Sequence, residues 1–422
     1  MIGAIADDFT GGTDVAVALR RAGLRTVIVF GDPSSVGALP DHDALVVALK
    51  TRTIRPAAAV GASTAAVAWL RERGADQIFF KYCSTFDSRS DGNIGPVADA
   101  LSELLGASRV AVVPSSPEHG RTQYAGHLFV GHQLLSESPM RHHPLTPMTD
   151  SFIPRLLAAQ TPHSVALVDL DQVREGRERI RARFDETDAR YLVVDAVSAS
   201  DLVEIGAACI DDVLVTGAAG LAGGLGIAQA ERMRAVAPTA APAPSPLPTA
   251  GAVLAGSCSA RTLEQIAFMR RSHDAYHLDP LALPDPQALA DAALAWVDTR
   301  NRTDAPLIYS SMPPAELRHV QHVLGVAGAS TILETAMGLI AVGLVRRGVR
   351  RLVIAGGETS GAVVTALDIG GAVIGAEAAP GVPWIHTSGA QPIALLLKSG
   401  NFGDLGLLAR SVESDSSKET AA

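Results

Sequence analysis

Short runs of apolar residues alternate with longer amphipathic stretches through the first 236 residues of the chain. The short runs are rich in Val and Ile, and their length predicts buried β-strands. They are Ile2–Ala6, Thr26–Phe30, Ala44–Leu49, Gln77–Phe80, Arg109–Val113, Val165–Leu170, Tyr191–Val194 and Val213–Thr216. Longer stretches such as Thr13–Ala22, Ala58–Arg73 and Val97–Leu105 predict helices between several of these strands. Because strands and helices alternate, the pattern predicts right-handed βαβ units around a parallel sheet.

The same pattern returns after residue 250. The predicted strands there are Ala252–Gly256, Leu307–Ser310 and Leu352–Ala355, and the predicted helices are Arg261–Arg271, Ala315–Ala327 and Ile332–Arg347. Between the two halves, residues 237–250 read APTAAPAPSPLPTA, and their prolines predict an extended linker. The sequence therefore predicts an α/β protein of two domains, residues 1–236 and 251–410, each a mostly parallel sheet flanked by helices. A polar tail is expected from residue 411 to residue 422.

The composition narrows the class of protein. Of the 422 residues, 47% are hydrophobic and 4% are aromatic, which suits aliphatic cores between parallel strands and helices. The net charge of −9 argues against a nucleic-acid partner, which would need a basic surface. The three cysteines, Cys83, Cys209 and Cys258, lie far apart and form neither a disulfide framework nor a zinc motif.

No segment of the sequence predicts a membrane location. The N-terminus lacks the basic and apolar regions of a signal peptide. The most apolar stretches are interrupted by Arg346, Arg347 and Asp368. No uninterrupted stretch approaches the ~20 uncharged apolar residues that a membrane helix needs. We therefore expect a cytoplasmic protein without a membrane partner. The sequence leaves open whether the chain forms a homo-oligomer.

The turn after the first predicted strand is the strongest candidate site. Residues 7–14 read DDFTGGTD, with three carboxylates around a double glycine. In an open parallel sheet, ligands bind beyond the carboxyl ends of the strands. The structural alternative is an N-cap, in which Thr10 or Thr13 starts the helix and an aspartate favours its positive end. That alternative explains one or two of the carboxylates. Adjacent carboxylates repel and usually need cations, a metal or substrate hydroxyls.

Two further polar loops follow predicted strands. Residues 81–95 include Lys81 at a strand end, where an ammonium can hold a substrate carboxylate or a phosphoryl group. A solvated loop that caps the next helix is the alternative. Residues 117–150 contain Arg121, a candidate for bidentate contact with a carboxylate. Metal binding by the histidines between His119 and His143 is the less favoured interpretation, because no H-x-x-x-H helix or cysteine partner accompanies them.

A glycine-rich turn at residues 217–226 follows the predicted strand Val213–Thr216. It is similar to a dinucleotide-binding loop, but its glycines lack the G-x-G-x-x-G spacing. The acidic residue expected ~20 positions later would fall in the proline-rich linker. A nicotinamide-dependent dehydrogenase is therefore disfavoured. A tight strand-to-helix turn and a loop that faces a phosphate remain equal alternatives.

Three small turns rich in glycine or hydroxyl groups lie in the second predicted domain, and the first two follow predicted strands. They lie at residues 257–259 (SCS), 356–362 (GGETSGA) and 398–403 (KSGNFG). Glycines let a phosphate approach the backbone, and a helix N-terminus supplies N–H donors. No G-x-x-x-x-G-K-[ST] motif is present, which excludes a P-loop. Together the three turns predict a nucleotide site.

Taken together, the motifs resemble those of the four-carbon acid sugar kinase family over nearly the whole chain. They are ADDFTG at 6–11, GRT at 120–122, GGETSGAV at 356–363 and KSGNFG at 398–403. Further motifs are similar to the branch that acts on 3-oxo-tetronates: KYCSTFDS at 81–88, GNIGPVA at 92–98, GHLFV at 126–130 and HPLTPMTD at 143–150. The resemblance implies a sugar-binding N-terminal domain and a nucleotide-binding C-terminal domain, with phosphorylation of the 4-hydroxyl of a 3-oxo-tetronate. It associates the acidic turn with the sugar acid, and it associates ATP with Ser257, Gly357, Glu358, Thr359, Ser360 and Gly400.

The resulting hypothesis is a kinase that uses ATP and Mg²⁺ to phosphorylate a small sugar acid. The substrate-binding residues that it predicts are Asp7, Asp8, Thr10, Lys81, Asp87, Arg121 and His127. Asp8, or its neighbour Asp7, would accept the proton of the attacking hydroxyl, and no protein ligand for Mg²⁺ can be named. Closure of the two domains would exclude water. Two alternatives remain: a kinase for a reduced tetronate, threonate or erythronate, and a sugar-acid sensor that binds ATP without turnover.

Overall fold

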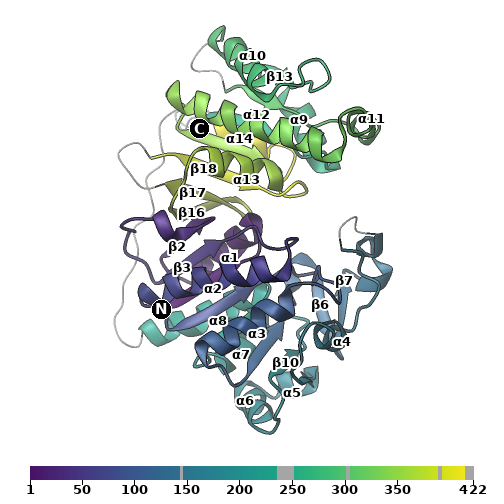
Figure 1. The fold of residues 1–422 in the computed structure, drawn as a ribbon. Coiled ribbons are helices and arrows are strands. Elements are labelled where there is room, and N and C mark those ends of the chain that lie inside the picture. The colour runs from purple at the N-terminus through teal and green to yellow at the C-terminus, as the bar shows by residue number, and fades with distance from the viewer. Residues whose placement is uncertain (143–145, 235–250, 301–304, 388–391, 414–422) are drawn as a thin grey trace, which may run out of the picture. The chain divides into compact units, whose positions relative to one another are not determined.

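A computed structural model describes residues 1–142, 146–234, 251–300, 305–387 and 392–413 (Figure 1). The chain divides into two compact units, Met1–Ala241 (unit 1) and Pro242–Ala422 (unit 2), and each is described by itself. The predicted linker, 237–250, lies outside the described residues, as does most of the predicted tail, from residue 414 onward.

Unit 1 is built on a parallel sheet. Its strands are β1 (Ile2–Ala6), β2 (Thr26–Phe30), β3 (Ala44–Ala48), β4 (Gln77–Lys81), β5 (Val110–Val113), β9 (Val165–Val168), β10 (Tyr191–Val194) and β11 (Leu214–Gly217). They lie in the order β2-β3-β1-β4-β11-β5-β10-β9, and each neighbouring pair is parallel. The strands read as continuous apolar runs because helices cover both faces of the sheet.

Two groups of helices cover unit 1's sheet. Helices α1 (Phe9–Arg21), α7 (Ala199–Ala208) and α8 (Ala219–Arg234) pack together, and α2 (Pro56–Glu72) packs against α3 (Ile94–Leu105). Right-handed crossovers that run in opposite directions place these groups on opposite faces. The shorter helices are α4 (Ile153–Ala158), α5 (Leu170–Arg174), α6 (Arg177–Asp185), η1 (Pro33–Ser35), η2 (Pro117–His119), η3 (Leu135–Glu137) and η4 (Pro139–His142).

A small antiparallel sheet belongs to the loop region after β5. Its strands are β6 (Arg121–Tyr124), β7 (His127–Val130) and β8 (Gln133–Leu134). Single bridges join Gln123 to Ala196 and His127 to Phe152, so this sheet lies against the segment after β10 and the start of α4 (Figure 1).

Unit 2 repeats the layered arrangement with a different sheet. Its strands are β12 (Gly251–Ala255), β13 (Ala275–His277), β14 (Leu307–Tyr309), β15 (Arg351–Ala355), β16 (Ala372–Ala379), β17 (Val382–Thr387) and β18 (Ala394–Lys398). The order is β13-β14-β12-β15-β18-β17-β16, and β17 pairs antiparallel with both β16 and β18. The helices are α9 (Ala260–Met269), α10 (Pro286–Asp298), α11 (Pro314–Leu324), α12 (Val326–Arg346), α13 (Gly357–Ala366) and α14 (Leu407–Val412).

The predicted α/β architecture with mostly parallel sheets is confirmed. Several details differ from the sequence prediction, and two of them are instructive. Helix α1 begins at Phe9 rather than at Thr13, because Asp8 caps it. The antiparallel pair β16–β17 was not predicted, although Pro380-Gly381 between the strands is a turn signal, and Gly381 has a φ of 74°.

Helix α12 is long and apolar enough to meet the length and hydropathy criteria for a membrane span, although it contains Glu334 and Arg346. It is 21 residues long, its most apolar window has a mean hydropathy of 1.6, and 44% of that window is buried. By length and composition alone it would pass as a membrane span. A core helix has the same properties, and α12 packs against α10, α11 and α13. Its buried face includes Met337, Ile340 and Leu344.

Each sheet has a point where the chain leaves neighbouring strands in opposite directions. In unit 1, the chain passes from β1 to β2 and β3 on one side and from β4 to β5 on the other. In unit 2, β12 leads to β13 and β14 on one side, whereas β15 leads to β16, β17 and β18 on the other. Open α/β sheets bind ligands at the carboxyl ends of strands at such switch points. The two candidate sites should therefore lie after β1 and β4 and after β12 and β15.

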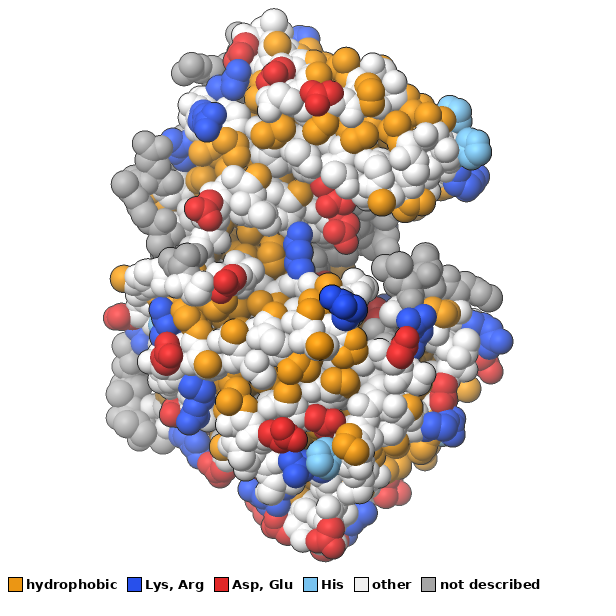
Figure 2. Space-filling view, in the orientation of Figure 1, with side chains coloured by type: hydrophobic (Ala, Val, Ile, Leu, Met, Phe, Trp, Pro, Cys, Tyr) orange, Lys and Arg blue, Asp and Glu red, His pale blue; other side chains and the backbone are white. Residues whose placement is uncertain are grey.

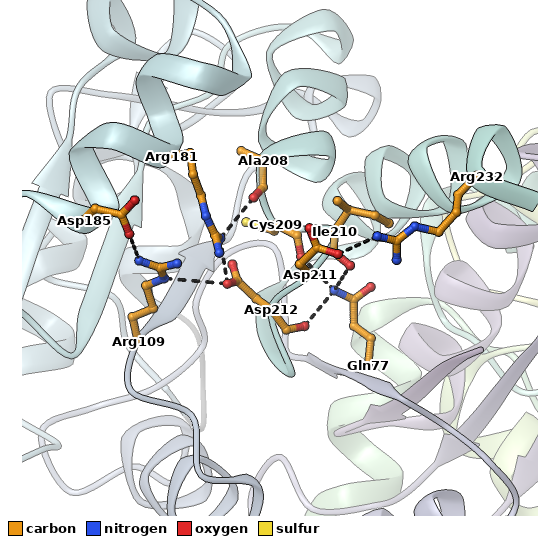
Figure 3. Close-up of polar contacts among 10 residues, drawn as sticks. All are labelled: Gln77, Arg109, Arg181, Asp185, Ala208, Cys209, Ile210, Asp211, Asp212 and Arg232. Atoms are coloured by element: carbon orange, nitrogen blue, oxygen red, sulfur yellow. Dashed lines mark hydrogen bonds and ion pairs between the residues drawn. The ribbon is translucent and has the colours of Figure 1, made fainter.

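The opposite edge of unit 1's sheet, where its strands begin, holds a charged group that we call the amino-edge cluster: Arg109, Arg181, Asp185 and Asp212 (Figure 3). Arg181 donates to Asp212 at 2.8 Å, and Arg109 lies 3.7 Å from Asp212 and also bonds Asp185. Nearby, Gln77 donates to the carbonyl oxygen of Asp212 at 2.8 Å. The cluster ties the start of β4, β5 and β11 to α6.

The visible surface carries charges of both signs. On the face shown in Figure 2, Lys and Arg side chains are interspersed with Asp and Glu, and no continuous basic patch lies among the described residues there. The distribution on this face agrees with the acidic net charge.

Candidate functional site

Asp7 directly follows β1 and is fixed by backbone hydrogen bonds to both neighbouring strands. Its N–H donates to the carbonyl oxygen of Lys81 at 3.1 Å, and its own carbonyl accepts from the N–H of Thr51 at 2.8 Å. The residues that follow β1, β3 and β4 are thereby held side by side. The register aligns Ala6 with Ala48 on β3 and with Lys81 on β4.

Arg52, in the turn after β3, joins the two adjacent carboxylates. Its Nε and Nη2 each donate to Asp7 at 2.8 Å, and Nη2 also donates to Asp8 at 2.7 Å. Burial alone would raise the pKa of Asp7, but the charge and hydrogen bonds of Arg52 and the charge of Lys81 outweigh burial, so this pKa is lowered. The repulsion expected between Asp7 and Asp8 is therefore relieved by a cation that the sequence analysis missed.

Asp8 is the N-cap of α1. Its Oδ1 accepts from the N–H of Gly11 at 2.8 Å, and its side chain is 31% exposed, compared with 7% for Asp7. The capping alternative is therefore correct, with Asp8 as the cap in place of Thr10 or Thr13. Thr10 lies half-buried in the first turn of the same helix. The cap uses one oxygen of Asp8 and leaves its carboxylate partly open to a ligand.

Lys81 ends β4 and points toward the first turn of α1. A methyl group added at Gly11 would lie 2.7 Å from Lys81 Nζ and 2.4 Å from Asp8 Oδ1, so both polar tips border this glycine. Lys81 is 4% exposed and makes no hydrogen bond or ion pair with any residue that the structure describes. A nearly buried ammonium is costly without a partner, so this position is suited to an anionic ligand.

Asp14 completes what we call the carboxyl-edge cluster: Asp7, Asp8, Asp14, Arg52 and Lys81. Burial raises the pKa of Asp14 to about 7, the charge of Lys81 opposes this rise, and the charge of Asp8 adds to it. The cluster therefore contains a carboxyl group that is partly protonated near neutral pH. Perturbed titratable groups of this kind are enriched at functional sites.

Asn93 positions the turn that carries Arg52. Its Nδ2 donates to the carbonyl oxygens of Thr51 at 2.7 Å, Ile54 at 3.2 Å and Arg52 at 3.3 Å. Asn93 is 7% exposed and immediately precedes α3. The sequence holds a partial signal for Arg52, because this residue follows a predicted strand just as Asp7 and Lys81 do.

The loop after β4 is held by aromatic packing. Phe86 has a φ of 49°, unusual for a bulky residue, and is fully buried. Its ring packs edge-on against Tyr82, with centroids 5.4 Å apart. Next to it, Asp87 accepts a hydrogen bond from Thr85 at 2.6 Å. The predicted contact between Asp87 and substrate stays a prediction, because Asp87 makes no hydrogen bond or ion pair with the carboxyl-edge cluster among the described residues.

Arg121 and His127 lie on the small antiparallel sheet. Arg121 donates to the carbonyl oxygen of His119, and its Nε is buried without a partner among the described residues. His119 is close enough to Lys81 for its pKa to respond to that charge, although burial is the main cause of its lowering. The ring of His127 packs against Phe152, with centroids 4.9 Å apart. The contacts of Arg121 therefore lead toward the cluster through His119, whereas those of His127 lead to Phe152.

The glycine-rich turn at residues 217–226 serves close packing. A methyl group at Gly217 would lie 2.4 Å from the carbonyl oxygen of Val113, and one at Gly224 would lie 2.0 Å from that of Leu202. These contacts favour the tight-turn interpretation over a phosphate-facing loop. No group of three or more His, Cys, Asp or Glu among the described residues could hold a metal ion, so the histidine-rich region gives no such site there.

The turns of unit 2 converge at the carboxyl ends of β12, β15 and β18, which are adjacent strands. A methyl group at Gly256 would lie 2.1 Å from Thr359 Oγ1, and one at Gly400 would lie 2.4 Å from Ser257 Oγ. The structure thus brings together Ser257, Gly357, Glu358, Thr359, Ser360 and Gly400 from three turns. Gly357 and Glu358 are exposed at the N-terminus of α13, whereas Thr359 is 6% and Ser360 is 2% exposed.

The unit 2 edge is mainly neutral. Hydroxyl groups and the N–H groups of the first turn of α13 are its principal donors. Ser311, after β14, is a further hydroxyl that the sequence analysis missed, and its Oγ is buried without a partner among the described residues. Such an edge can bind a phosphate through backbone and hydroxyl donors with little fixed charge.

Comparisons with known proteins agree with this division. A family model for a sugar-binding N-terminal domain matches residues 2–225, and one for a nucleotide-binding C-terminal domain matches residues 252–408. The 3-oxo-tetronate kinase of Pseudomonas fluorescens is 48% identical over 412 residues, which cover 96% of this chain and 94% of that protein. The 3-oxo-tetronate kinase of Salmonella typhimurium is 41% identical over 416 residues, covering 97% and 98%.

Solved structures share the fold. A crystal structure from Salmonella typhimurium LT2, described as a candidate tRNA synthase, has a TM-score of 0.89 and 41% identity, and the match covers 97% of this chain and 98% of that one. A Haemophilus influenzae protein has a TM-score of 0.83 and 38% identity, with coverage of 97% and 98%.

Proposed function

The chain belongs to the four-carbon acid sugar kinase family, and on that premise we propose that it transfers the γ-phosphoryl group of ATP to the 4-hydroxyl of a 3-oxo-tetronate. It is a sugar-acid kinase, a phosphotransferase with an alcohol group as acceptor. The observation that carries the substrate class is the environment of Lys81, a nearly buried ammonium without an ion pair among the described residues, at the switch point of the sugar-binding unit. A small carboxylate would give this ammonium the direct ion pair that it lacks among the described residues.

The substrate carboxylate binds to Lys81 in this proposal. Arg52 is already occupied by Asp7 and Asp8, which leaves Lys81 as the cation of the cluster that can pair with a ligand. Asp8 and Thr10, at the start of α1, offer oxygens to the sugar hydroxyls. Arg121 is proposed as a second contact to the carboxylate, and Asp87 and His127 are proposed as outer contacts to the substrate.

Asp8 is the better of the two general-base candidates. Asp7 is nearly buried and bound at both oxygens by Arg52, which lowers its pKa and makes it a weak base. The carboxylate of Asp8 is partly exposed beside Lys81. The 4-hydroxyl oxygen attacks the γ-phosphorus, the bond from that phosphorus to the β,γ-bridging oxygen breaks, and ADP leaves. The hydroxyl proton passes to Asp8.

ATP binds to unit 2 through the converging turns. The hydroxyls of Ser257, Thr359 and Ser360 and the backbone of Gly357 and Gly400 are the proposed contacts. Helix α13 directs its N-terminal N–H groups toward this edge, which favours a polyphosphate. Phosphoryl transfer needs mainly positioning and charge neutralisation, and these donors provide the positioning.

Mg²⁺ is proposed to arrive with ATP. Mg²⁺ in kinases is usually held by phosphate oxygens, waters and one or two carboxylates, so a dedicated cluster of protein ligands is not required. Glu358, exposed in the first turn of α13, is the residue that would supply an oxygen. The ion would neutralise charge on the transferring phosphoryl group.

The proposal is tested by a substrate panel. The purified chain would be incubated with ATP, Mg²⁺ and each stereoisomer of the 3-oxo-tetronates, threonate and erythronate, with ADP release and the phosphorylated product both measured. We expect the highest kcat/KM with a 3-oxo-tetronate and a 4-phosphate as product. A higher kcat/KM with threonate or erythronate would assign the reduced acid as substrate. ATP binding without ADP release on any acid would indicate a sensor.

A further inference from the structure

Lys398 is a buried cation in unit 2 without a counter-charge among the described residues. It is the last residue of β18 and is 1% exposed. Its Nζ donates to Thr262 Oγ1 and to the carbonyl oxygen of Gly400, both at 2.9 Å. The charge that acts on it belongs to Arg261, which is also a cation. A buried ammonium bound only by neutral oxygens destabilises the fold unless an anion completes the site.

The side chain of Lys398 is one of three donors that converge on a single carbonyl. The carbonyl oxygen of Gly400 accepts from Ser259 Oγ at 2.7 Å, Thr262 Oγ1 at 2.8 Å and Lys398 Nζ at 2.9 Å. The peptide is trans, so the N–H of Asn401 points in the opposite direction. Asn401 is exposed, and its N–H has no hydrogen-bond partner among the described residues. The arrangement presents this N–H to a ligand.

We propose that Lys398 is a positioning residue for ATP: together with Thr262 and Ser259 it fixes the Gly400–Asn401 peptide so that the Asn401 N–H donates to a phosphate oxygen, and its charge complements that phosphate. The inference rests on the proposed function for the identity of the nucleotide. It adds a reason why this turn holds a glycine, since a side chain at Gly400 would meet Ser257 Oγ at 2.4 Å and Ser259 Oγ at 2.9 Å.

The charge of Lys398 gives the proposal a pH signature. Burial and the charge of Arg261 lower the pKa of Lys398 to about 8. Among the described groups around it, Arg261 on α9 is the charged one that acts on it, and its hydrogen-bond partners Thr262 and Gly400 are neutral. A phosphate nearby favours the protonated amine, so nucleotide binding should take up protons near pH 8.

The test compares ADP with adenosine, which lacks the phosphates, by calorimetry on the full chain. We expect Lys398→Met to weaken ADP binding about tenfold or more, because the Gly400–Asn401 peptide loses a donor that fixes it and the phosphate loses a nearby positive charge. Adenosine affinity should stay within about twofold of the wild type. Arg271→Met removes an exposed cation from the same unit and should leave both affinities unchanged. Wild-type ADP affinity should fall as the pH rises from 7 to 9, and the variant should lose this dependence.

The inference would be overturned if Lys398→Met bound ADP as tightly as the wild type does. It would also be overturned if the variant lost as much affinity for adenosine as for ADP, because that result indicates a purely structural role. Should the variant fail to fold, proton uptake by the wild type decides. Proton uptake at pH 8 is measured by calorimetry in two buffers of different ionisation enthalpy. Uptake that accompanies the binding of ADP but not of adenosine supports the proposal. The absence of uptake with ADP overturns it. A wild-type chain that binds neither ADP nor a non-hydrolysable ATP analogue would instead refute the ATP proposal itself.

Discussion

Unit 1 carries arginine–aspartate clusters at both edges of its parallel sheet, and their charges are balanced differently. In the amino-edge cluster, each of Arg109 and Arg181 contacts an aspartate (Figure 3). In the carboxyl-edge cluster, Arg52 is paired in the same way, but Lys81 beside it makes no ion pair within the described chain. Paired charges can stabilise a fold, whereas an unpaired, nearly buried cation lowers stability and is retained where a ligand needs it.

The comparison shows that two charged clusters of similar composition can be assigned different roles according to whether one of their charged side chains lacks an ion pair. The amino-edge cluster lies where the strands begin, away from the switch point, and joins β5 and β11 to α6, while Gln77 links the start of β4 to Asp212. The carboxyl-edge cluster lies at the switch point and combines an unpaired ammonium, a partly exposed carboxylate and a carboxyl group with a raised pKa. The first should therefore respond to mutation in stability, and the second in activity.

The largest effect should follow from removing the unpaired cation. Lys81→Met should lower kcat/KM for the sugar acid about 10³-fold, because a buried charge contact to substrate of about 2–5 kcal/mol is lost. The free energy of unfolding should change little, because removing a nearly buried ammonium offsets the lost attraction to Asp7 and Asp14. Steady-state kinetics and urea unfolding measure the two quantities. Lys50→Met, at an exposed lysine in the turn after β3, is the matched control and should retain activity. Equal activity of both variants would contradict the assignment.

The next effect should follow from removing the charge of Asp8 while keeping its cap. Asp8→Asn retains an oxygen that can accept from the N–H of Gly11, so α1 should remain intact. Loss of the general base should lower kcat about 10²-fold, with a smaller change in the KM for ATP. Asp285→Asn makes the same change at the N-cap of α10 and should not alter kcat. Near-normal kcat in Asp8→Asn would show that Asp8 is not the base.

The amino-edge cluster should give the reverse result. Asp212→Asn removes the carboxylate that Arg181 contacts at 2.8 Å, and its side chain is 9% exposed. The free energy of unfolding should fall by about 1–3 kcal/mol, because arginine partners lose a charge-assisted hydrogen bond. The kcat and KM of the folded enzyme should not change. Asp185→Asn, at a side chain that is 60% exposed, should cost at most about 1 kcal/mol. A loss of kcat in Asp212→Asn would break the contrast between the edges.

The sequence predicted the parts of the carboxyl-edge cluster that are visible in local patterns. Asp7, Asp8 and Lys81 follow buried strands, and the rule that ligands bind at strand ends was enough to select them. Arg52 follows a predicted strand too, but its role depends on β3 lying beside β1, a pairing that the pattern of apolar residues does not specify. Strand order is a long-range property, so the partner of an adjacent pair of carboxylates could not be named.

In unit 2, the glycine and hydroxyl turns were visible in the sequence, whereas the role of Lys398 was not. From the sequence, a lysine at a strand end can be either exposed or buried, because its burial depends on which helix covers it. In the structure, Lys398 donates a hydrogen bond to Thr262, and Ser259 donates one to the carbonyl oxygen of Gly400. The hairpin of β16 and β17 was missed for a different reason: its Pro-Gly turn signal lies between strands whose apolar pattern is weak.

The smallest effect should come from Asp14, whose burial in the carboxyl-edge cluster raises its pKa from 3.8 to about 7. Neutral Asp14 contributes stability that is fully present below pH 3.8 and is lost as the pH rises through about 7. Asp14→Asn keeps a neutral side chain at every pH. The melting temperature of the variant should therefore exceed that of the wild type by an amount that grows with pH and levels off above about pH 7.

Thermal unfolding between pH 4.5 and pH 8 measures this gap, and Asp171→Asn, at an exposed aspartate on α5, supplies the control. The control should show the same melting temperature as the wild type throughout, because its carboxylate is open to solvent. A constant gap for Asp14→Asn would mean that the asparagine acts through packing and not through charge. A gap that widens when the sugar acid is bound would instead tie the titration of Asp14 to the occupied site, because a ligand carboxylate on Lys81 weakens the attraction that opposes the raised pKa.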